Sequence, residues 1–183
     1  MPADCVKALS KGNHPEAFLL WAEEVLPLRM GARGRACRDL WDAIPEPSWL
    51  ATYARQAGVP PADLVRAAAM CAESVLGHVA EGDRPAAARA IRAAMLWAGN
   101  PAGERIVGPT HVMFGTGDDG RVREGMSAWH AARAAMWAEG APGLSLRHVS
   151  DVAATAKDRD IRDRCMSIVR ETVPFLDLAG GGR

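Results

Sequence analysis

Residues 60–101 decide the fold class, and they read PPADLVRAAAMCAESVLGHVAEGDRPAAARAIRAAMLWAGNP. Apolar side chains recur at helical spacing on both sides of a short connection, Glu81-Gly82-Asp83. Proline fits the first turn of a helix, where its missing N–H has no partner within the helix. Pro61 and Pro85 therefore predict two helix starts, and Gly99-Asn100-Pro101 predicts an end. The stretch is expected to form a hairpin of two helices, over 61–80 and 84–98.

Helical patterns of the same kind extend over most of the chain. Alanine supplies 35 of the 183 residues, against three Phe and one Tyr. Alanine is the strongest helix former, whereas strands favour β-branched and aromatic residues. We therefore expect an all-α fold, with about eight helices in stacked antiparallel hairpins. Further helices are predicted over 15–27, 32–44, 121–138 and 160–173, with two more that begin at capping residues Ser48 and Ser145.

The chain length fits one domain, which we expect to span residues 1–178, followed by a flexible tail at 179–183. Residues 15–44 weakly repeat residues 61–98, as stacked helical hairpins would. Residues 99–120 carry six glycines and two prolines, and they are expected to form one long Gly-rich loop. Long ordered loops in compact domains usually have a function.

The composition argues against several classes of protein. The chain has 22 basic and 22 acidic residues, whereas nucleic-acid binders usually carry a basic excess. It has neither an apolar run of membrane-spanning length nor the pattern of a signal peptide. The four cysteines are widely spaced without a Cys-x-x-Cys pair, which favours reduced thiols in a cytoplasmic protein. We expect neither a nucleic-acid nor a membrane partner, and the sequence does not predict the oligomeric state.

Histidine spacing gives little sign of a metal site. Each of the five histidines is at least 18 residues from the next, and no His-Glu-x-x-His or Glu-x-x-His pattern is present. We therefore expect no helix to supply two metal ligands one turn apart, and we predict no metal and no cofactor. A site assembled only in three dimensions, from His111, His130 and Asp118, stays open as an alternative.

Other catalytic patterns are incomplete. The sequence Gly115-Thr116-Gly117-Asp118-Asp119-Gly120 resembles neither a phosphate-binding loop, since no lysine follows it, nor a calcium-binding EF-hand loop. No Gly-x-Ser-x-Gly turn is present, and Cys71 lies among apolar neighbours. These observations favour a protein that is not an enzyme, but they do not exclude an enzyme.

One stretch combines three local motifs: Cys71-Ala72-Glu73-Ser74-Val75-Leu76, the turn Glu81-Gly82-Asp83-Arg84-Pro85, and an Ala-rich helix that ends near Trp97. With these motifs the chain resembles the Imm-5-like family of bacterial immunity proteins, over about residues 65–157. The Ala-rich stretches 128–138 and 152–156 resemble later helices of that family. The resemblance implies a small, helical, cytoplasmic protein that neutralises a cognate toxin in bacterial competition. It implies no catalytic residues.

The leading hypothesis is therefore a non-enzymatic immunity protein that covers a toxin by a protein–protein interaction. The alternative is a helical enzyme that depends on a metal ion or small ligand, with a site of dispersed His, Asp and Glu residues. A DNA-binding regulator is a third possibility. The residues predicted to contact the partner are those around the long loop, with one tryptophan after a Pro-rich turn: His111, Met113, Phe114, Asp118, Asp119 and Trp49.

Overall fold

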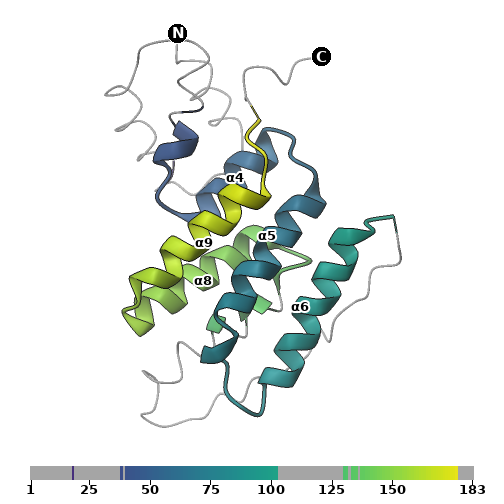
Figure 1. Ribbon diagram of the computed structural model, residues 1–183, viewed down its shortest axis with the longest axis vertical. Helices are drawn as coiled ribbons and strands as arrows, with labels where there is room; N and C mark the ends of the chain where they lie inside the picture. The colour runs from purple at the N-terminus through teal and green to yellow at the C-terminus, as the bar shows by residue number, and fades with distance from the viewer. Residues whose placement is uncertain are drawn as a thin grey trace.

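The computed structural model describes residues 18, 38, 40–102, 130, 131, 133–135 and 137–176. Every regular element within these residues is a helix, so the all-α prediction is confirmed (Figure 1). Residues 40–43 and the segment 130–137 also carry helical residues. The complete elements are α4 (Pro47–Gln56), α5 (Pro61–Ser74), the 3-10 helix η2 (Leu76–His78), α6 (Arg84–Gly99), α8 (Pro142–Ala156) and α9 (Arg159–Thr172).

Helix α5 is the centre of the described body, and α4, α6, α8 and α9 all pack against it (Figure 1). Alanine makes this possible, because its small side chain lets neighbouring helices approach closely. Ala67, Ala68 and Ala69 are completely buried in the middle of α5, and Ala72 is 1% exposed. Larger side chains from the surrounding helices, such as Leu146 and Val149 of α8, complete the core.

The predicted hairpin of residues 61–98 is present as α5 and α6, with one difference. The α-helix ends at Ser74, and the chain continues through η2 rather than as a helix to residue 80. Val75 is β-branched and Gly77 adds backbone freedom, so this sequence favours the helix less than the alanines before it. Val75 and Val79 still reach the core on either side of η2.

Two of the predicted helix starts differ from the observed ones. Helix α8 begins at Pro142 and α4 begins at Pro47, so neither Ser145 nor Ser48 is the capping residue. Ser145 is instead completely buried, and its hydroxyl donates a hydrogen bond of 2.6 Å to the carbonyl oxygen of Ala134. The bond ties α8 to the segment 130–137. No helix in the described residues is long and apolar enough to cross a membrane.

Helices α8 and α9 form a second hairpin through a tight turn. Lys157 adopts the left-handed conformation, with φ of 56°, directly after α8. Asp158 then accepts a hydrogen bond of 3.0 Å from the backbone N–H of Asp160 and so caps α9. At the far end of α9, Arg170 donates hydrogen bonds to the carbonyl oxygens of Asp42 and Ile44. These contacts hold α9 against the segment that precedes α4.

Candidate functional site

The structure places only part of the predicted partner-binding set. His111, Met113, Phe114, Asp118 and Asp119 lie outside the described residues, so their role stays a prediction. Trp49 lies near the start of α4 and is partly exposed, as its place after a Pro-rich turn predicts. Its ring centre is 5.4 Å from that of Phe18, and it packs against the core. Trp49 therefore has a packing role in addition to any contact with a partner.

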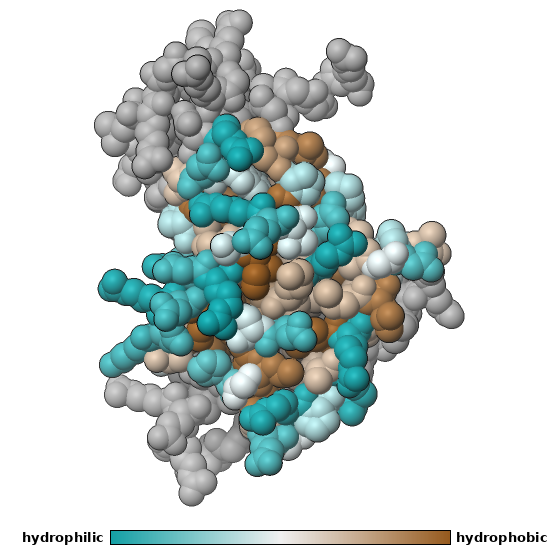
Figure 2. Space-filling view, viewed as in Figure 1, coloured by the Kyte–Doolittle hydropathy of each residue, from teal (hydrophilic) through white to brown (hydrophobic). Residues whose placement is uncertain are grey.

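Helix α6 has an outer face that no other described helix covers. We define this outer face of α6 by four exposed side chains: Arg89, Arg92, Met95 and Leu96. Leu96 is 64% exposed and Met95 is 37% exposed, whereas Ile91 and Ala94 on the opposite side are buried against α5. Hydrophobic and hydrophilic side chains lie next to each other over α6 (Figure 2).

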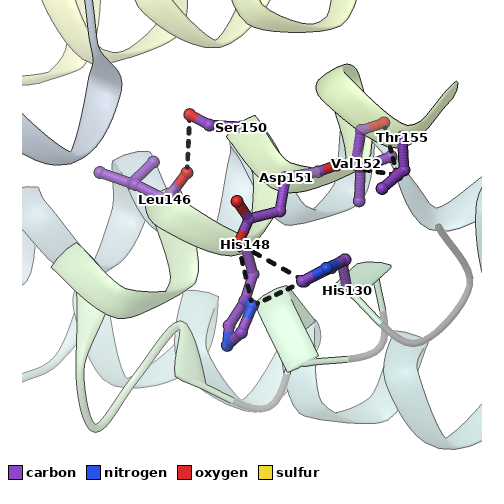
Figure 3. A network of polar contacts seen from close by, with 7 residues as sticks. All are labelled: His130, Leu146, His148, Ser150, Asp151, Val152 and Thr155. Carbon is purple, nitrogen blue, oxygen red and sulfur yellow. Dashed lines mark hydrogen bonds and ion pairs between the residues drawn. The ribbon is translucent and has the colours of Figure 1, made fainter. Parts of the chain in front are cut away.

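A second candidate site lies where α8 meets the segment 130–137. His148 and Asp151 are one turn apart and share a face of α8, and His130 approaches them from the other segment (Figure 3). The Ser145–Ala134 hydrogen bond lies one turn away from the two histidines on both elements. Because that bond is buried, it fixes how the two elements meet and so brings His130 to His148.

Three polar atoms converge in this cluster. The Nδ1 atoms of His130 and His148 are 3.1 Å apart. The Oδ2 atom of Asp151 is 3.5 Å from Nδ1 of His130 and 3.7 Å from Nδ1 of His148. The side chains of His130 and His148 are 12% and 11% exposed, and that of Asp151 is 39% exposed. The two imidazoles are thus largely withdrawn from water, while the carboxylate reaches it.

Burial makes both histidines harder to protonate. The pKa of His148 is lowered to about 4, chiefly because burial disfavours the imidazolium. The neighbouring His130, Arg133 and Arg147 act in the same direction, and the Asp151 carboxylate opposes them. The pKa of His130 is lowered by burial and by Arg133, again against Asp151. Both imidazoles are therefore neutral at pH 7, which is the state in which they bind metal ions.

The lowered pKa of His148 predicts that the folded protein loses stability in mild acid. The unfolded chain takes up a proton on this histidine at about pH 6.5, whereas the folded chain takes it up only near pH 4. The free energy of unfolding of the metal-free protein should therefore fall by about 1–2 kcal/mol between pH 7 and pH 4, after allowance for partial solvent screening. Urea unfolding in EDTA at several pH values measures this loss.

Carboxyl groups also titrate near pH 4 and change the stability there. The informative comparison is therefore between the pH dependence of the unfolding free energy in the wild type and in His148→Gln. The variant should show a flatter pH profile than the wild type. Parallel profiles for the two proteins would show that the His148 imidazole does not cause the loss.

Sequence reasoning missed this cluster for an identifiable reason. The sequence suggests His130 as a ligand only together with His111 and Asp118, and the patterns His-Glu-x-x-His and Glu-x-x-His do not include a histidine that precedes an aspartate by three residues. The expectation that no helix offers two ligands one turn apart is wrong, because His148-Val149-Ser150-Asp151 places an imidazole and a carboxylate at that spacing on α8. His-x-x-Asp was therefore a usable signal. His130 is 18 residues from His148, and its proximity follows only from the packing of α8.

The two described cysteines behave as the sequence predicts. Cys71 and Cys165 are free and completely buried. The thiol of Cys71 donates to the carbonyl oxygen of Cys165 over 3.6 Å. Burial raises the pKa of the Cys165 thiol, so this sulfur stays protonated and unreactive.

Comparison with known proteins gave no match to a family model, a curated protein or a solved structure. The resemblance to the Imm-5-like family therefore stays a prediction.

Proposed function

We propose that this protein binds a second protein, a toxin of bacterial competition, and neutralises it by covering part of its surface. The resemblance around the turn Asp83-Arg84-Pro85 suggests the toxin. The outer face of α6, which begins at that turn, supports a role in binding. It is the observation that carries the proposal, because α5 holds this helix on one side and no other described helix covers the opposite side.

The chemistry of this face fits an acidic partner. Helix α6 contains three arginines and no acidic residue. Its outer face combines two of them, Arg89 and Arg92, with the exposed apolar side chains of Met95 and Leu96. Arginine and methionine are enriched in protein interfaces, and opposite charges across an interface speed association. We therefore expect a partner surface with carboxylates around an apolar depression.

A growth assay with a candidate toxin, taken from the genes next to the one that encodes this protein, tests this proposal. Cells that produce the toxin should grow when they also produce the wild-type protein, and should stop growing when they produce Leu96→Glu. The substitution places a carboxylate in the apolar part of the face and opposite an acidic partner, so affinity should fall by about 30-fold or more. Calorimetry with the two purified proteins measures that affinity.

The matched control is Ala154→Glu, which adds the same charge to an exposed position on α8. It should protect cells as well as the wild type does. Full protection by Leu96→Glu would remove α6 from the interface, and failure of the wild type to protect would contradict toxin neutralisation itself.

A further inference from the structure

The cluster of His130, His148 and Asp151 has the geometry of a metal site. The three converging atoms form a triangle with sides of 3.1, 3.5 and 3.7 Å. In a tetrahedral zinc site, ligand atoms lie about 3.3–3.4 Å from one another. A point about 2.0–2.1 Å from all three atoms lies close to their plane, and this is the length of Zn–N and Zn–O bonds in proteins. An ion therefore fits with little movement of the ligands.

We propose that His130, His148 and Asp151 form a binding site for one divalent transition-metal ion of the zinc class. The two imidazoles bind through Nδ1 and the carboxylate through Oδ2. Each residue offers one ligand atom, and the three atoms lie within 4.8 Å of one another. The inference does not depend on toxin binding.

The three converging atoms can all act as metal ligands. A neutral imidazole carries one N–H, on either of its two nitrogens. The distance between the two Nδ1 atoms suits one N–H···N bond, in which one imidazole donates and the other accepts. The Asp151 carboxylate accepts hydrogen bonds and donates none, and each of the three atoms can offer a lone pair to a cation. With both protons moved to Nε2, a cation would satisfy one lone pair on each atom.

The types of ligand select the class of ion. Imidazole nitrogen suits zinc, copper, iron and nickel, whereas magnesium and calcium prefer sites made of oxygen ligands alone. Two histidines and one carboxylate leave at least one coordination position free, as in zinc sites that keep a water molecule. The partial exposure of Asp151 gives water a route to that side of the cluster.

The positive charges around the cluster should weaken the binding of a metal ion, and removing one of them tests the proposed site. Arg133 and Arg147 place positive charge near the histidines. The same field repels a metal cation. Replacing Arg133 with methionine, which keeps much of the apolar stem, should therefore tighten metal binding. If the three residues only pack against one another and bind no metal ion at this place, Arg133→Met should not change the affinity for zinc.

The experiment uses the full chain, stripped with EDTA, dialysed, and titrated with ZnCl₂ in a calorimeter. We expect one ion per chain, and a second titration with CoCl₂ should give the visible absorption of a tetrahedral or five-coordinate cobalt ion. His148→Gln and Asp151→Asn should each weaken zinc binding by about 100-fold or more, because each removes a direct ligand and second-shell changes alone cost 10–100-fold. Arg133→Met should strengthen it several-fold.

The matched control is His78→Gln, which removes a histidine from η2, outside the cluster. It should bind zinc as the wild type does. Circular dichroism establishes that each variant is folded, and Asp151→Asn provides the test if His148→Gln does not fold. The proposal is overturned if the stripped protein binds no zinc, or if Asp151→Asn and His148→Gln bind it as tightly as the wild type.

Discussion

Replacing Tyr53 with alanine should lower the free energy of unfolding by about 3–5 kcal/mol, the cost of deleting a large buried aromatic side chain. Tyr53 is completely buried in α4, and its ring packs against two other aromatic rings, which also contact each other. The ring centres are 5.5 Å from Trp41 and 6.4 Å from Phe175, which follows α9. Alanine would leave a cavity where α4, residues 40–43 and residues 173–176 meet. Urea unfolding followed by circular dichroism measures the loss.

The control for this prediction is Tyr53→Phe, which keeps the ring. The tyrosine hydroxyl donates to the carbonyl oxygen of Leu176 over 3.4 Å, a long hydrogen bond. Its removal should therefore cost about 1 kcal/mol or less. A loss below about 1 kcal/mol for Tyr53→Ala would mean that the aromatic cluster does not hold these segments together.

Enlarging Ala68 to leucine should destabilise the protein by about 3 kcal/mol, near the upper end of the range for overpacked cores. Ala68 is completely buried in the middle of α5, where four helices pack around one. Three additional carbon atoms at this position force a neighbouring helix to move. Thermal unfolding should show a clearly lower midpoint than for the wild type.

The matched variant is Ala154→Leu, at an exposed position of α8. It makes the same chemical change where there is space, so stability should change by about 0.5 kcal/mol or less. Equal effects of the two substitutions would contradict the claim that alanine in α5 is required for close helix packing.

The helical hairpin of α5 and α6 could be predicted because residues at its boundaries favour helix starts and ends through local backbone effects. Pro61, Pro85 and Gly99 lie at its helix ends, and their effects on the backbone need no distant contacts. The end of α5 was harder to place. The apolar spacing continues to Val79, and only the packing shows that the chain reaches the core there through η2 rather than through an α-helix.

Ser145 shows why a capping prediction failed. Serine is a favoured helix cap, but Pro142 already suits the first turn, and the helix begins there. The Ser145 hydroxyl then lies inside the protein, where a buried polar group needs a partner, and it finds the Ala134 carbonyl oxygen. That partner is on another segment, so no local pattern could reveal it.

One part of the candidate metal site could be predicted from the sequence, and the other part depends on packing. The spacing of His148 and Asp151 could be read from the sequence, since residues three apart lie on one face of a helix. The contribution of His130 depends on how α8 packs against the segment 130–137, which the buried Ser145 bond helps to fix. The field of Arg133 at this site likewise follows from packing.

The proposed metal site depends on the convergence of His130, His148 and Asp151. Crystals of the zinc-loaded protein, measured on both sides of the zinc absorption edge, test it directly. We expect one anomalous peak per chain, about 2.0–2.2 Å from Nδ1 of both histidines and from Oδ2 of Asp151. An empty cluster, or a zinc ion bound only elsewhere on the chain, would contradict it.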